Sequence, residues 1–127
     1  MHNIIKKLTL IVLIGLFSQP LLAQQPGGAL KQIADIVASI NHFPSDADKT
    51  ALAAIAANDE YPQPLRDMAT SVANISHAAD ADGKAVMASI QADDEAPDRA
   101  KTLAGIIAAL NHTPSAADKA RLAELFP

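Results

Sequence analysis

One phrase of ten residues occurs twice in this chain, and its spacing constrains the fold more than any other feature of the sequence. INHFPSDADK begins at position 40, and LNHTPSAADK begins at position 110. An offset of 35 residues aligns a more divergent unit between these two, so that the ranges 31–57, 66–92 and 101–127 superimpose without a gap. A fixed period of about 20 to 50 residues is typical of architectures in which similar supersecondary units stack on one another. The chain is therefore predicted to be a repeat protein of three units.

Each unit is predicted to form a helix, a turn and a second helix. Before the turn, apolar residues of the first and third units follow the i, i+3, i+4, i+7 spacing of one helical face. These residues are Ile33, Ile36, Val37 and Ile40 in the first unit and Leu103, Ile106, Ile107 and Leu110 in the third. Pro26, Pro62 and Pro97 precede the first helix of each unit, where a missing N–H is harmless.

The repeated phrase itself is the predicted turn between the two helices. Pro44 and Pro114 are expected to end the first helix, and Ser45 and Ser115 are good N-caps for the second. In the middle unit Asp80 stands in the place of the capping serine and can cap in the same way. The turn chemistry thus supports the same helix boundaries in all three units.

We therefore expect an all-α fold of three tandem helix-turn-helix hairpins of 35 residues, with about six helices in one small domain. This domain spans 24–127, with units at 27–61, 62–96 and 97–127.

The second helices differ in composition, which suggests an order in the stack. The uncharged stretch 50–58 is expected to be enclosed between neighbours, whereas the charged stretch 119–126 is expected to end the stack with one face in water.

Residues 1–23 are predicted to be a cleaved signal peptide and not part of the fold. Two lysines precede an apolar run at 8–17, and Pro20 lies shortly before the cleavage that we expect after Ala23. The run is shorter than the roughly 20 apolar residues that a membrane-spanning helix needs. We expect the domain at 24–127 to be periplasmic or secreted, without membrane insertion after cleavage.

The domain is acidic and contains no cysteine. Without the two lysines of the predicted signal peptide, 8 of the 10 basic residues remain against 14 acidic ones, a formal net charge of −6. Negative charge repels nucleic acid and anionic lipid. A chain with 0 cysteines must be held together by packing and not by disulfides. The expected partner is another protein, and nucleic acid is not expected.

His42, His77 and His112 occupy the same position in all three units and are the candidate metal ligands. Three imidazoles are the protein ligands of one class of zinc site. In a stack of hairpins, however, equivalent residues lie at least about 8 to 10 Å apart, which is too far for a shared ion unless the units close into a ring. We therefore expect each histidine to cap the C-terminal end of its helix by donating to free carbonyls, and no metal site is assigned.

Lys49, Lys84 and Lys119 also recur, in the first turn of each second helix. The helix dipole does not favour a cation at this end. A salt bridge to a neighbouring acidic residue is the expected reason for their position.

No motif in the sequence points to catalysis. The chain lacks cysteine, G-x-S-x-G, H-E-x-x-H and a glycine-rich phosphate loop. We therefore expect no enzyme activity, no catalytic residues and no cofactor. The expected function is an exported protein-interaction module, of the inhibitor or immunity type. The alternative is a protein that binds a small ligand or a metal through histidines at the helix ends.

Overall fold

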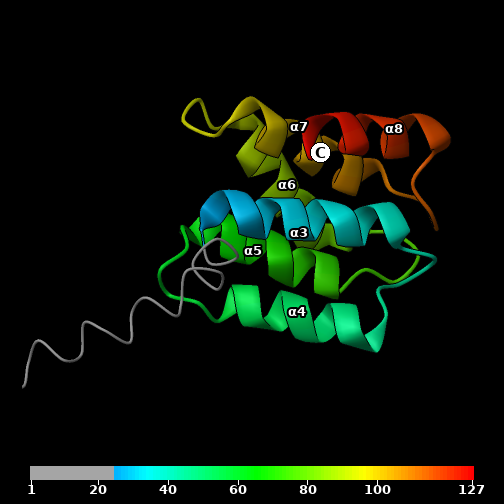
Figure 1. The fold of residues 1–127 in the computed structure, drawn as a ribbon, viewed down its shortest axis with the longest axis horizontal. Helices are drawn as coiled ribbons and strands as arrows, with labels where there is room; N and C mark the ends of the chain where they lie inside the picture. Colours follow the sequence, from blue (N-terminus) through cyan, green and yellow to red (C-terminus); the bar gives the residue numbers. More distant parts are fainter. Residues whose placement is uncertain (1–24) are drawn as a thin grey trace, which may run out of the picture.

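The computed structural model describes residues 25–127, which contain six α-helices and no strand (Figure 1). In chain order the helices are α3 (Pro26–Ser39), α4 (Asp46–Ala56), α5 (Gln63–Ala73), α6 (Ala81–Ala92), α7 (Asp98–Ala109) and α8 (Ala116–Leu125). The predicted all-α class is confirmed for this part of the chain. No helix within 25–127 has the length and apolar character needed to cross a membrane. The predicted signal peptide at 1–23 lies outside the described residues.

Local sequence signals set the helix starts as expected. Helix α3 has a proline in its first turn, and α5 and α7 each follow a proline N-cap. Ser45 Oγ accepts the backbone N–H three residues later at 3.1 Å, and Ser115 Oγ does so at 3.0 Å. Asp80 Oδ1 accepts the equivalent bond at 2.7 Å. All three predicted caps of the second helices are confirmed, and each satisfies an N–H that the helix cannot pair.

The six helices pack so that the last one returns to the first. Helix α3 contacts both α5 and α7. These three inner helices bury five or six residues each, whereas the outer helices α4, α6 and α8 bury one to three. Helix α4 packs against α5, α6 against α7, and α8 against α3. The helix at 119–126 has one face in water as expected, because α8 buries only Leu122. It does not end an open stack, since it also packs against α3.

The hydrophobic core lies along α3, α5 and α7. Its largest fully buried side chains include one residue from each of the outer helices α4 and α6. They are Ile33, Leu52, Met68, Met87, Leu103, Ile107, Val37, Val72 and Pro44. The expectation that 50–58 is enclosed between neighbours is wrong, since Ala53, Ala54 and Ala57 are exposed and α4 buries only Leu52 and Ile55. A run of alanine is apolar enough for an interior but loses little when it faces water.

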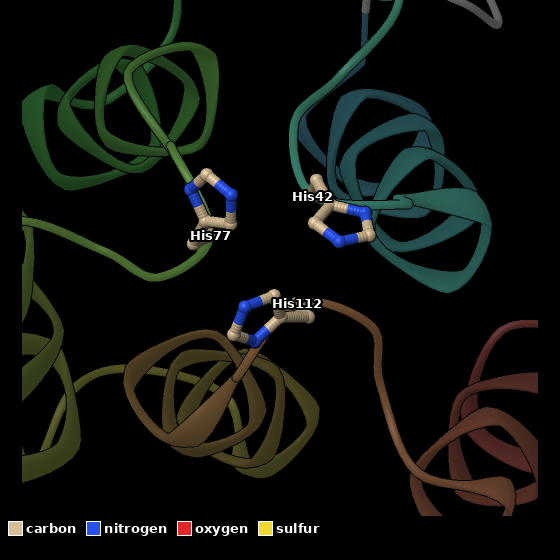
Figure 2. A group of neighbouring side chains, drawn as sticks. All are labelled: His42, His77 and His112. Carbon is tan, nitrogen blue, oxygen red and sulfur yellow. The ribbon is translucent and has the colours of Figure 1, made fainter.

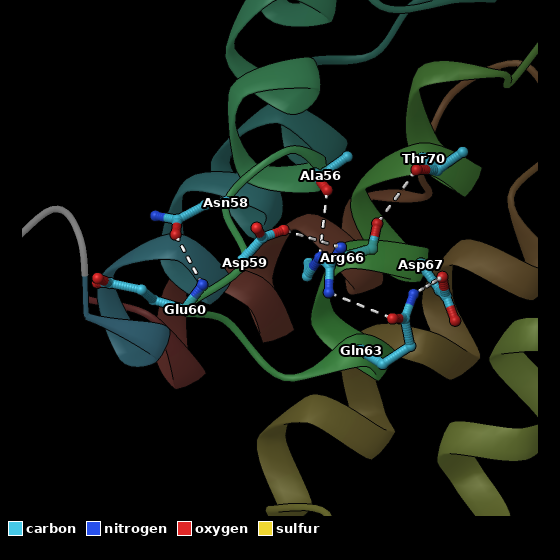
Figure 3. Close-up of polar contacts among 8 residues, drawn as sticks. All are labelled: Ala56, Asn58, Asp59, Glu60, Gln63, Arg66, Asp67 and Thr70. Carbon is cyan, nitrogen blue, oxygen red and sulfur yellow. Dashed lines mark hydrogen bonds and ion pairs between the residues drawn. The ribbon is translucent and has the colours of Figure 1, made fainter.

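Arg66 fixes the junction between α4 and α5 (Figure 3). Its Nε donates to the carbonyl of Ala56 at the end of α4 at 3.3 Å, and its Nη1 donates to Gln63 Oε1 at 3.2 Å. The other guanidinium nitrogen lies 3.5 Å from a carboxylate oxygen of Asp59. A cation at a helix C-terminus pairs with carbonyls that the helix leaves free. The side chain therefore ties the start of α5 to the end of α4.

Candidate metal centre

Three turns, each joining an inner helix to the next outer helix, carry the recurring histidines. Buried residues flank each histidine two positions before and two positions after it. They are Ile40 and Pro44 around His42, Ile75 and Ala79 around His77, and Leu110 and Pro114 around His112. These buried residues hold each turn in place on both sides of its histidine, so the backbone of the histidine has little freedom to move.

All three histidines have a left-handed backbone conformation. Their φ angles are 74° at His42, 71° at His77 and 68° at His112, and no other non-glycine residue within 25–127 has a positive φ. For an L-residue this conformation costs roughly 1 to 2 kcal/mol, whereas glycine adopts it freely. No glycine of the described chain is used in this way. The chain thus places an imidazole at three positions where the backbone favours glycine.

The backbones of the three histidines form a closed ring of hydrogen bonds. The N–H of His42 donates to the carbonyl of His112 at 2.6 Å, that of His77 to His42 at 2.6 Å, and that of His112 to His77 at 2.5 Å. These bonds explain why the turns come together. They do not explain the imidazoles, because any residue could supply the same N–H and carbonyl.

The three imidazole rings lie close together around a common centre (Figure 2). The ring centroids of His42 and His77 are 5.1 Å apart, those of His42 and His112 are 5.0 Å apart, and those of His77 and His112 are 4.9 Å apart. One ring nitrogen from each histidine can be chosen so that all three lie within 4.8 Å of one another. The expectation that these residues lie at least one interhelical distance apart is wrong, because the turns face one another across the ring of hydrogen bonds.

Two asparagines set the proton position on two of the rings. Nδ1 of His42 lies 2.7 Å from Oδ1 of Asn41, and Nδ1 of His112 lies 2.6 Å from Oδ1 of Asn111. An amide oxygen only accepts hydrogen bonds, so Nδ1 is the donor, and in the neutral imidazole Nε2 is then the nitrogen with the free lone pair. Metal-bound histidines usually have such a partner on the second ring nitrogen. Sequence reasoning missed these asparagines, although the dipeptide Asn-His recurs in the first and third units.

The predicted capping role of the histidines is not what their side chains do. Helix α3 ends at Ser39 and α7 at Ala109, three residues before His42 and His112. The ring nitrogens of these two residues pair with their neighbouring asparagines, not with helix carbonyls. The capping expectation is therefore wrong for His42 and His112.

Solvent reaches the histidine cluster. His77 and His112 are exposed, and His42 is partly buried. A tetrahedral zinc ion with bonds of about 2.0 to 2.1 Å needs its ligand nitrogens roughly 3.3 Å apart. The nitrogens of the cluster lie within 4.8 Å of one another, so they must move closer together to share one ion. The three histidines are thus a group of neighbouring side chains that could hold a metal ion.

The recurring lysines are not paired with acidic residues. Within 25–127 the ion pairs are Lys31 with Asp35 at 3.0 Å and Arg66 with Asp59 at 3.5 Å. The expected salt bridges of Lys49, Lys84 and Lys119 are thus absent from the described chain. Lys49 instead places its Nζ 5.9 Å from the ring centroid of Phe43, the residue after His42.

A cavity lies among the N-terminal ends of α3, α5 and α7, away from the histidines. This cavity of about 420 Å³ has Leu30, Leu65, Met68 and Ala100 among its lining residues, with Arg99 also at its wall. Its volume is within the range of small-molecule sites. The histidines line neither this cavity nor the smaller one beside it.

Comparison with known proteins gives no relative. No protein-family model, curated protein or solved structure matches this chain. The function must therefore be argued from the site itself.

Proposed function

We propose that this chain is an exported, non-catalytic protein that binds one divalent transition-metal ion through His42, His77 and His112. The observation that carries the proposal is the convergence of three imidazoles on three left-handed turns. Backbone strain at a non-glycine residue persists where a side chain is needed for function. Here the strain occurs three times, and each time the residue is the same favoured metal ligand.

The donor atoms favour late first-row metals. Imidazole nitrogen suits Zn²⁺, Cu²⁺ and Ni²⁺, whereas Ca²⁺ and Mg²⁺ prefer oxygen ligands. The chain has 0 cysteines, so no thiolate competes for the ion. Zn²⁺ is therefore a suitable probe, and Cu²⁺ is expected to bind more tightly in keeping with the general order of divalent metals.

We infer that three units related by an offset of 35 residues, at 27–61, 62–96 and 97–127, close into a ring and thereby bring the histidines together. The packing of α4 on α5, α6 on α7 and α8 on α3 supports this interpretation. The middle unit has the sequence Ser-His-Ala at 76–78, where the other two units have Asn-His-Phe and Asn-His-Thr. Both neighbours of the histidine therefore differ in the middle unit, but His77 itself is kept. Ring closure gives the repeated histidine its role, because one ligand from each unit completes the site.

Export of the domain at 24–127 is part of the proposal and rests on the two lysines and the apolar run of the segment 1–23. A bacterial periplasm or exterior is the expected location. The acidic composition supports a protein or metal partner over nucleic acid.

A protein-interaction role is the second candidate. Phe43, directly after His42, is the large apolar side chain that stands exposed, with 56% of its surface accessible. An exposed aromatic residue beside the histidines is suited to contact with another protein. Loss of partner binding in a Phe43→Ser variant that still binds zinc would favour this role.

Calorimetric titration with Zn²⁺ tests the metal proposal. We expect one ion per chain and a rise in melting temperature, since a ligand at 100 times its Kd stabilises the native state by about 2.7 kcal/mol. For a domain of this size that corresponds to roughly 10 °C or more. Single changes to alanine at His42, His77 or His112 should each remove most of the gain. Thr113→Ala, beside a proposed ligand but not one itself, is the matched control and should keep it.

Zinc that leaves the melting temperature of the wild-type protein unchanged would overturn the proposal. So would three histidine variants with small, additive losses of stability and undiminished zinc binding, because separate residues far from a shared ion behave in that way.

A further inference from the structure

The clustered side chains cannot fill the coordination sphere of a metal ion. Among the described residues, the group that can hold an ion consists of His42, His77 and His112, and each offers one nitrogen. Zinc takes at least four ligands, and the other late divalent metals take four to six. An ion in this site therefore keeps at least one position that the cluster does not occupy.

The open position faces solvent. The backbone ring ties the three turns together, and core residues anchor the turns on the inner side. The imidazoles of His77 and His112 are exposed on the other side. A small molecule can thus approach the ion without any movement of the helices.

The charge of the loaded site favours an anion at the open position. Histidine binds a metal as a neutral ligand, so three imidazoles leave the full charge of a divalent ion uncompensated. No carboxylate of the described chain belongs to the ligand group. A bound divalent ion is the largest local charge in such a site. An anion that replaces a metal-bound water lowers the net positive charge of the metal and its ligands.

We propose that the metal-loaded site binds a small anion directly on the metal, in exchange for water. This inference rests on the proposed metal binding. The histidine cluster leaves one coordination position of the metal open, and the uncompensated charge of the ion favours an anionic donor there.

The chain loaded with one equivalent of Co²⁺ provides the test, because the visible absorption of Co²⁺ reports its coordination. Azide is the probe, and acetate is the competitor of the carboxylate class. We expect a saturable change of the Co²⁺ spectrum with azide and its reversal by acetate. The chain without metal should show no azide binding by calorimetry.

Lys49→Gln is the control variant, because the ammonium group of Lys49 lies near Phe43 and is the alternative holder of an anion. If azide binds on the metal, its dissociation constant for the Lys49→Gln variant should lie within about twofold of the wild-type value, since exposed charges at a distance contribute little. Loss of azide binding in Lys49→Gln would place the anion on the lysine and overturn the inference.

The remaining outcomes separate the inference from the proposed function. Co²⁺ bound at one ion per chain with a spectrum unaffected by azide would overturn the inference alone and leave the metal site intact. A chain that binds no Co²⁺ would overturn both.

Discussion

Replacement of His77 separates the role of the backbone turn from that of the imidazole. His77→Gly and His77→Ala both remove the ring, so they differ in how well the new residue adopts a φ of 71° and in the freedom of the unfolded chain. Alanine keeps the left-handed cost of roughly 1 to 2 kcal/mol, and glycine avoids it. Glycine in turn loses roughly 0.5 to 1 kcal/mol through its greater freedom in the unfolded chain. The glycine variant should therefore be more stable than the alanine variant by about 1 kcal/mol.

The control is an exposed position in the middle of a helix. Ala88 lies in α6 and is exposed, and Ala88→Gly should destabilise the domain by roughly 0.5 to 1 kcal/mol. Glycine is thus expected to be the better residue at position 77 and the worse residue at position 88. Urea unfolding followed by far-UV circular dichroism, with EDTA present, measures both differences.

An alanine variant at position 77 that equals or exceeds the glycine variant in stability would refute the left-handed turn and, with it, the argument that the histidine is kept for its side chain. Both variants should lose most of the stabilisation by zinc, because each lacks the same ligand. A difference between them in zinc binding would mean that the backbone and not the imidazole governs the affinity.

Other positions give independent tests. Asn41→Ala should weaken zinc binding roughly 10- to 100-fold in calorimetric titration. Ser76→Asn should strengthen zinc binding by giving His77 the hydrogen-bond partner that the other two histidines have. Unchanged zinc affinities in both variants would exclude a contribution of the asparagine hydrogen bonds to metal binding. Ser45→Ala should lower the free energy of unfolding by about 0.5 to 2 kcal/mol through loss of the cap; an unchanged urea midpoint would contradict this. Burial, with the nearby charge of Glu60, raises the pKa of Tyr61 above 10.0. Phenolate absorbance should therefore appear at a higher pH in the folded than in the unfolded protein. The stability that the protonated phenol contributes should be lost as the pH rises through the pKa of the folded state.

Much of the secondary structure could be predicted from the sequence because it depends on near neighbours. The caps at Ser45, Asp80 and Ser115 act over three residues, and the apolar spacing of α3 and α7 repeats within a few turns of helix. Such local signals are the same whatever the rest of the chain does. The histidines were recognised as candidate ligands for a different reason, because they recur at a period of 35 residues that is visible in the sequence.

The contact between the first and last helices, and with it the geometry of the site, was decided only by the tertiary structure. A stack and a ring can be built from the same helices and turns, because they differ in small rotations between neighbouring units that add up along the chain. Only when α8 meets α3 do His42 and His112 become neighbours, although 70 residues separate them. The asparagine bonds to Nδ1 join adjacent residues, whereas the approach of the three rings depends on that long-range contact. The sequence determined which residues recur, and long-range packing determined that they meet.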